Sequence, residues 1–191
     1  MNAEISRRLE NLIRLGTVKT FKPSQPFPTV TVDLGEITTA EIRFLNLRAG
    51  NDKTWDPISP GEEVIVLSPC GVLELGIAIA GLNNENNPSI SNEPNKNIRL
   101  FSDGCFISYD TSSHILETIL PEGGKAVITA LGGITLNGDT TINGNLEING
   151  SSHSTGDFTT GADVRAGDIS LKSHKTSGVQ SGGGTSGGPV P

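Results

Sequence analysis

Residues 134–164 read ITLNGDTTINGNLEINGSSHSTGDFTTGADV, and this stretch decides the fold. Apolar and small side chains fill the even positions, whereas polar side chains dominate the odd ones. This two-residue period is typical of a β-strand with one apolar and one polar face. The large apolar residues on the even face are Ile134, Leu136, Ile142, Leu146, Ile148, Phe158 and Val164.

A second period of six residues lies on top of the first. Asn-Gly pairs recur at Asn137-Gly138, Asn143-Gly144 and Asn149-Gly150, and Gly156 continues the spacing. Asn-Gly tolerates a positive φ better than other dipeptides, so each pair can bend the chain. Short strands that bend at regular intervals predict a β-helix or β-prism rather than a flat sheet.

The apolar face of this repeat is thin, because each hexad offers one or two medium-sized aliphatic side chains. One chain cannot enclose a dry core with so few groups, and repeats of this kind stack or associate to hide their apolar seam. We therefore predict an intertwined homotrimer with the seven even-position residues as its core. The alternative is a single-chain solenoid, which needs at least three coils, whereas the repeat supplies roughly two.

Composition limits the classes of function. The chain has 191 residues with 24 Gly, 11 Pro and 4% aromatic residues, which favours turn-rich β structure over one large core. The net charge of −7, three times that in a trimer, argues against binding to nucleic acid or to anionic lipid. We find no transmembrane run and no secretory leader, so we expect synthesis in the cytoplasm. Cys70 and Cys105 lack a metal-type spacing and are expected to be reduced and structural.

The first half of the chain predicts a helix and a barrel. In residues 1–15, Ile5, Leu9, Leu12 and Ile13 share one helical face, and Gly16 is a plausible stop. This helix can pack on its own domain or dock onto a partner. Residues 16–85 contain five short strands between turn signals, which predict a small antiparallel barrel, with the OB-fold as the leading candidate. Its aromatic residues are scattered and its charge is acidic, so we expect a scaffold rather than a nucleic-acid reader.

The second half predicts a linker, a shaft and a tip. Residues 86–97 form a polar linker, residues 98–172 the shaft of the β-helix, and residues 173–191 the apex. At Gly167-Asp168 the alternation slips by one residue, which indicates a turn or a bulge. The wider, upper part of the shaft is expected to be filled by larger apolar side chains, namely Phe101, Phe106, Ile115, Ile119 and Ile128.

The order of these parts, ending in LKSHKTSGVQSGGGTSGGPV at residues 171–190, resembles the baseplate assembly protein V family. These proteins are the central membrane-piercing spikes of contractile phage tails and of R-type pyocins. The resemblance covers the whole chain and implies a homotrimer with an OB-fold collar and a triple-stranded β-helix. It also implies that the N-terminal region contacts the baseplate hub and tail tube, and that sheath contraction drives the spike through the outer membrane of the target bacterium. No catalytic site is implied.

In that family a His-x-His pair near the C-terminus holds an iron ion on the trimer axis. Here the pair is His174-Lys175-Thr176, so the second histidine is missing. Three copies of His174 offer three nitrogens, an adequate set for iron or zinc with open positions. The resemblance places Thr176, Gly178 and Val179 at the apex. The alternative is an apex closed by hydrogen bonds of Ser, Thr and Gly without a metal.

Two other functions are compatible with a β-helical repeat. One is a tail fibre or adhesin that binds surface glycans, which would need a carboxylate pair or an aromatic platform in the repeat. The other is a hexapeptide-repeat acyltransferase with His153 as the catalytic base. Two coils give no substrate cleft, and His153 falls on an odd position that is predicted to face water. The acyltransferase also leaves the barrel and the tail unexplained. Against the fibre, Trp55 and Tyr109 lie outside the repeat, and its carboxylates are more simply a solvated polar face.

Overall fold

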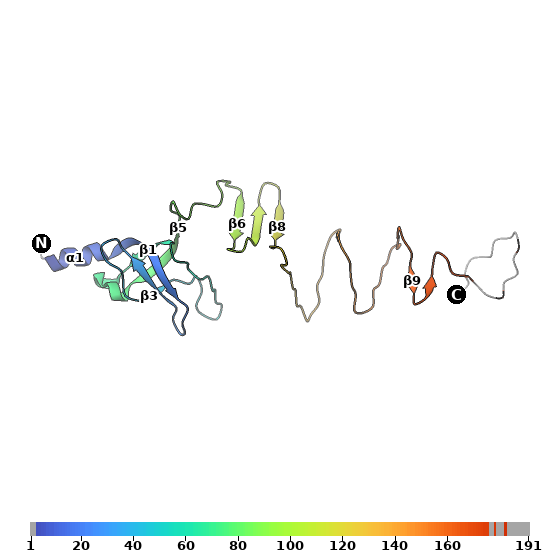
Figure 1. The fold of residues 1–191 in the computed structure, drawn as a ribbon, viewed down its shortest axis with the longest axis horizontal. Helices are drawn as coiled ribbons and strands as arrows, with labels where there is room; N and C mark the ends of the chain where they lie inside the picture. The colour runs from blue at the N-terminus through green and yellow to red at the C-terminus, as the bar shows by residue number, and fades with distance from the viewer. Residues whose placement is uncertain (1–2, 176–177, 179–181, 183–191) are drawn as a thin grey trace. The chain divides into compact units, whose positions relative to one another are not determined.

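The computed structural model describes residues 3–175, 178 and 182, and the chain divides into two units, residues 1–128 and 129–191. Regular structure consists of strands apart from one α-helix and two short 3-10 turns (Figure 1). The prediction of an all-β fold with a short N-terminal helix is confirmed. No helix among the described residues is both long and apolar enough to cross a lipid bilayer.

Helix α1 covers Ala3–Asn11 and is shorter than the predicted helix of residues 1–15. Glu4 in its first turn accepts hydrogen bonds from Arg7 and Arg8, which lower the pKa of the Glu4 carboxyl to about 2. The prediction that Ile13 continues the helix to Gly16 is wrong, because residues from Ile13 onward form a strand. Pairing with β4 (Glu63–Leu67) satisfies the backbone of this segment over a long range and overrides its helical periodicity.

Five strands close into a barrel in the order β1-β2-β3-β5-β4. The predicted number of strands is confirmed, and the strands are β1 (Ile13–Lys22), β2 (Thr29–Asp33), β3 (Ile42–Phe44), β4 (Glu63–Leu67) and β5 (Ile77–Leu82). The expectation of purely antiparallel pairing is wrong at one place, because β3 and β5 run parallel. The 3-10 turns η1 (Pro69–Gly71) and η2 (Leu73–Leu75) lie in the connection between β4 and β5. The identity of this barrel as an OB-fold stays a prediction.

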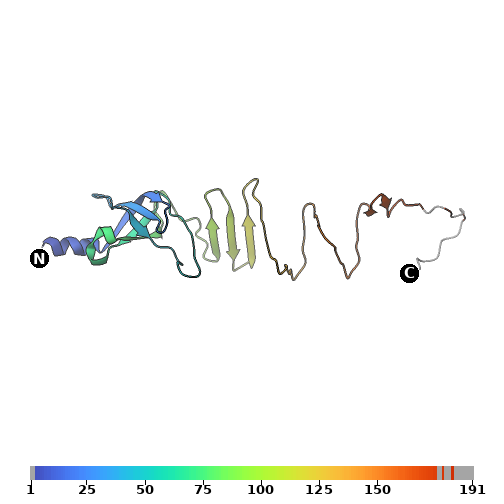
Figure 2. The same cartoon turned by 90° about the horizontal axis from the view of Figure 1, so that it is seen from below.

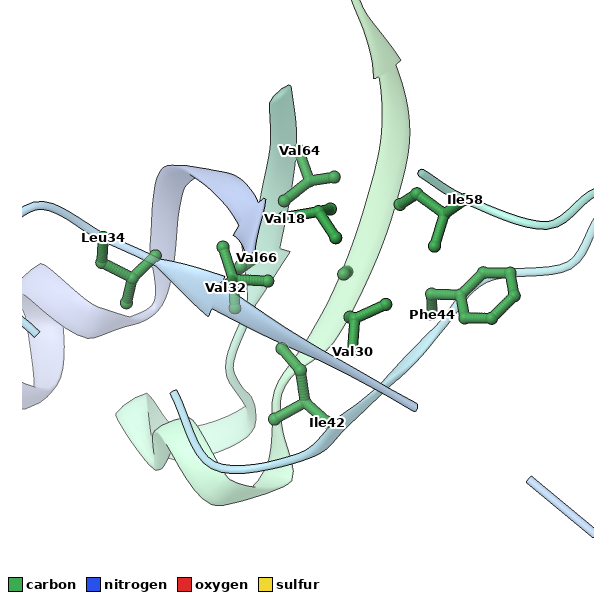
Figure 3. Packing of buried hydrophobic residues seen from close by; sticks show 10 residues of the cluster. Val18, Val30, Val32, Leu34, Ile42, Phe44, Ile58, Val64 and Val66 are labelled. Atoms are coloured by element: carbon green, nitrogen blue, oxygen red, sulfur yellow. The ribbon is translucent and has the colours of Figure 1, made fainter. Parts of the chain in front are cut away.

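The barrel has a hydrophobic core of its own (Figure 3). Its ten buried residues are Val18, Val30, Val32, Leu34, Ile42, Phe44, Ile58, Val64, Val66 and Ala78. Gly16 of β1 points into this core, and a Cβ atom there would lie 2.6 Å from both Val32 Cγ1 and Asp33 O. The lack of a side chain at residue 16 therefore lets β1 and β2 pack closely at this end of the barrel.

A three-stranded antiparallel sheet follows the barrel, in the order β6-β7-β8. Its strands are β6 (Lys96–Leu100), β7 (Phe106–Asp110) and β8 (Ile115–Ile119), so the first strand begins inside the predicted linker of residues 86–97. Every residue of β8 is exposed, and the predicted shaft residues Ile115 and Ile119 are 58% and 50% exposed. Among the residues of these three strands only Ser108 of β7 is buried.

The second unit alternates between extended segments and bends (Figure 2). Its backbone bends at Gly138, Asn143-Gly144, Asn149-Gly150, Thr155-Gly156 and Gly161-Ala162. The predicted six-residue spacing of bends is therefore confirmed. The only strands described beyond residue 128 are β9 (Arg165–Ala166) and β10 (Ile169–Ser170), which pair as a hairpin.

We predict that Gly16→Ala destabilises the barrel by about 1–3 kcal/mol, because the added methyl group would overlap the Val32 side chain and the Asp33 carbonyl. Gly50→Ala is the matched control, because a Cβ atom at residue 50 has no heavy atom of the described chain within 4 Å. Chemical denaturation followed by Trp55 fluorescence measures both variants. Equal stability of the two variants would contradict the close approach at Gly16.

Candidate functional site

The even-position residues of the repeat lie exposed in the single chain. The seven predicted core residues range from 36% exposed at Val164 to 78% at Phe158, and Leu136 and Leu146 reach 71% and 66%. An apolar seam of this length marks an interaction surface, since soluble proteins rarely leave one open. The structure thus leaves all seven side chains exposed within the described chain, and their alignment and burial in a trimer stay a prediction.

The backbone of the same segment is also unpaired. Among the described residues, no backbone-to-backbone hydrogen bond involves residues 134–163. The hydrogen bonds within this segment involve side chains, such as the one from the Ala162 amide to Thr160 Oγ1. Backbone N–H and C=O groups are nearly always paired in folded proteins when they are taken out of water. Extended strands with both groups free are suited to pairing with other strands.

Ordered contacts resume at the hairpin of β9 and β10, where Gly167-Asp168 forms the turn. Gly167 has a φ of +61°, which favours glycine, and residues 166 and 169 pair on either side of it. The turn predicted from the phase slip is confirmed. The Leu171 amide also donates to the Val164 carbonyl at 2.8 Å and so extends the contact beyond the two short strands.

The Asp163 carboxylate holds this hairpin to the residues that follow it. Asp163 accepts hydrogen bonds from the Lys172 amide at 3.1 Å and from Arg165 Nε at 3.3 Å. The hydroxyl of Ser170, the Lys172 amide and the Arg165 guanidinium, in that order, lower the pKa of the Asp163 carboxyl. Ser170 is buried, and its hydroxyl also accepts a hydrogen bond from the Ser173 amide at 3.0 Å. We call Asp163, Ser170 and Ser173 the hairpin clasp.

The clasp leads directly to His174, which is fixed by the backbone of β10 and of the residue after it. The His174 amide donates to the Ser170 carbonyl at 2.9 Å, and His174 Nδ1 lies 3.2 Å from Ser170 O and 3.1 Å from Leu171 O. Carbonyl oxygens only accept hydrogen bonds, so Nδ1 carries the hydrogen. In the neutral ring Nε2 then keeps its lone pair. A backbone carbonyl on one ring nitrogen is the common second partner of a metal-binding histidine.

A complete metal site is not formed by one chain. Within the described part of the chain, no three His, Cys, Asp or Glu side chains come together in a metal-type group. Thr176 and Val179 lie outside the described residues, and Gly178 has a φ of +80°. His153 lies exposed in the repeat, as its odd position predicts. The residues favour a metal only if several copies bring their His174 rings together.

The hairpin clasp was not anticipated from the sequence. Asp163 occupies an odd, polar position of the repeat, and an alternation pattern shows which face a residue occupies but not its hydrogen-bond partners. The available signal was the two-residue Gly-Asp turn at residues 167 and 168, which folds the residues after it back toward Asp163.

Comparison with known proteins agrees with the C-terminal motif and with the order of the parts. Residues 168–190 match the GpV Apex motif. The chain is 31% identical over 133 residues to the spike protein of Escherichia phage P2. The similarity covers 69% of this chain and 61% of the phage P2 protein, so the match spans less than two thirds of that relative.

We predict that Asp163→Ala opens the hairpin clasp and speeds hydrogen exchange at the Lys172 amide. The pKa of Asp163 is lowered in the folded chain, so its contribution is complete above its unfolded pKa of about 3.9. That contribution is lost as the pH falls through the lowered folded pKa. Asp157→Ala, which removes an exposed carboxylate of the same unit, is the control. Unchanged exchange at Lys172 in Asp163→Ala would show that the clasp is unimportant.

Proposed function

Because this chain belongs to the family of phage baseplate spike proteins, we propose that it forms the homotrimeric central spike of a contractile injection particle. The particle is a phage tail or an R-type pyocin, and the spike punctures the outer membrane of the target bacterium when the sheath contracts. The observation that carries this proposal is the repeat of residues 134–163, which is unpaired both in its backbone and in its apolar side chains.

Three copies of the repeat can pair the free backbone groups and bury the exposed apolar side chains at the same time. Strands from three chains that wind about one axis can pair their backbone groups between chains and leave no free edge. The even-position side chains then turn toward the axis, where Gly, Ser and the few aliphatic residues fit a narrow centre. The prediction of a triple-stranded β-helix, or β-prism, rests on this combination.

The barrel does not depend on other copies for its folding, because it encloses ten buried hydrophobic residues of its own. The barrel has its own core and the repeat does not. This contrast supports a division of roles in which the barrel is an attachment domain and the repeat is the rigid shaft. The N-terminal helix offers Ile5 and Leu9, which are 52% and 56% exposed, for contact with the baseplate hub and tail tube.

Mechanical work replaces chemistry in this function. The contracting sheath supplies the energy of puncture, so the spike needs stiffness and a narrow tip rather than a catalytic group. Intertwined strands resist shear, since no chain can slide without breaking hydrogen bonds to both neighbours. The protein would be made in the bacterial cytoplasm, assembled into the tail baseplate, and used at the outer membrane of the target cell.

The apex is suited to an axial metal ion held by His174 of each chain. The hydrogen on Nδ1 leaves each Nε2 available as a ligand, and three such nitrogens satisfy the minimum donor set for iron or zinc. An ion bound there would tie three chain ends together, where termini otherwise fray. The alternative, an apex closed by Ser, Thr and Gly hydrogen bonds, would leave His174 as a structural residue only.

We predict a particle of about 60 kDa by light scattering, three times the 20.0 kDa of one chain. Ile142→Asp should weaken this trimer, because each copy would bury an uncompensated charge at about 3–5 kcal/mol. The matched control is Asn143→Asp, which adds the same charge one position along on the polar face. A mass near 20 kDa for the unchanged protein would overturn the trimer.

We also predict about one iron or zinc ion for every three chains by elemental analysis, and its loss in His174→Ala. His153→Ala, which removes an exposed histidine of the repeat, should keep the metal. Thr176→His should make the metal harder to remove with a chelator, since it would supply six nitrogens per trimer. Metal-free native protein, or equal metal in His174→Ala, would favour the hydrogen-bonded apex.

A further inference from the structure

The outer surface of the barrel has one aliphatic side. Strand pairing places Ile13, Leu67 and Ile77 in one row across β1, β4 and β5, and Leu15, Ile65 and Ile79 in the next. The inward-facing neighbours of these residues, such as Val64 and Val66, fill the core, so both rows face outward. We call these six residues the aliphatic wall.

The aliphatic wall is uncovered within the described chain. Ile13, Leu15 and Leu67 are 67%, 58% and 37% exposed, and the other three members are half-buried. A sheet face exposed to water normally alternates polar side chains outward. Here each of the three neighbouring strands β1, β4 and β5 contributes two outward-facing aliphatic residues, which is the signature of a contact surface.

The opposite side of the same barrel shows what a solvent-facing surface looks like in this protein. The row that contains Ile77 continues to Arg43 of β3 and Thr29 of β2. Glu41 accepts hydrogen bonds from Lys22 at 3.1 Å and from Thr29 at 3.3 Å. Thr20 and Thr31 hydrogen-bond to each other at 2.7 Å. This polar side, formed by Lys22, Thr29, Thr31, Glu41 and Arg43, is already satisfied by its own contacts.

We propose that the aliphatic wall is the contact surface between the barrels of three copies of this chain. The inference rests on the proposed trimer and adds to it a second interface, separate from the shaft. The repeat joins the three chains, so their barrels are held at high effective concentration and a modest apolar surface is enough to bring them together. A partner present only at solution concentration would lack this advantage.

Charge supports a second copy as the occupant of the wall. The chain carries a net charge of −7, so three copies repel one another wherever charged surfaces meet. The two rows of the aliphatic wall contain no charged residue, whereas the polar side carries Lys22, Glu41 and Arg43. Contact through the wall therefore brings three acidic chains together without placing like charges against each other.

Distances between spin labels in the full-length protein test this interface. Cys70 and Cys105 are both free, so Cys70→Ser with Cys105→Ser gives a background without reactive thiols. Glu63→Cys places a label in the row next to the aliphatic wall, beside Thr17 and Leu82. Thr31→Cys places a matched label on the polar side. We expect a short, narrow distance between copies for residue 63 and a longer distance for residue 31.

A charged substitution in the aliphatic wall is the second test of this interface. Leu15→Lys should lengthen and broaden the residue 63 distances, while the trimer mass stays unchanged because the shaft is intact. Thr20→Lys is the control, because Thr20 lies on the same strand as Leu15 but hydrogen-bonds to Thr31 on the polar side. It should leave the residue 63 distances unchanged. A trimer in which residue 63 labels are as far apart as residue 31 labels would overturn the interface alone. A monomer would overturn the proposed trimer as well.

Discussion

The constraint on which this structure depends is that a polypeptide backbone must find partners for its N–H and C=O groups. The barrel meets this requirement within one chain, because its five strands close on themselves. Residues 134–163 do not meet it, and their regular bends prevent the segment from folding into a flat sheet. The main chain of the repeat is therefore suited to pairing with other strands, before any side chain is considered.

The side chains follow the same division. In the barrel, residues such as Val32 and Val64 are fully buried, whereas Leu136 and Phe158 of the repeat remain mostly exposed. In the proposed trimer, a thin apolar seam and many glycines would make the shaft narrow, and intertwined strands would make it stiff. The hairpin clasp at Asp163 restores order within the chain just before His174, so the last described residues are positioned for an apex.

Much of this architecture could be predicted from the sequence, because it follows from residue patterns that repeat every two or six positions. The Asn-Gly spacing and the slip at Gly167 correspond to an observed series of bends and an observed turn, whereas the inward and outward faces of residues 134–164 stay a prediction. Long-range pairing could not be predicted in the same way. The apolar residues Leu9, Leu12 and Ile13 keep a helical spacing past the end of α1, although Ile13 begins β1 by pairing with β4. The parallel pairing of β3 with β5 has no signal in the local sequence. The aliphatic wall became visible only when register placed Leu15 beside Ile65 and Ile79.

Hydrogen exchange at the backbone amides of residues 134–163 tests the central claim most directly. These amides have no backbone partner in the described chain, so slow exchange all along the extended segments would indicate pairing with strands of other copies. The account predicts that amides along the extended segments between the Asn-Gly bends exchange as slowly as those of the barrel strands in the assembled protein. Exchange at the rate of an open chain throughout this segment would contradict it.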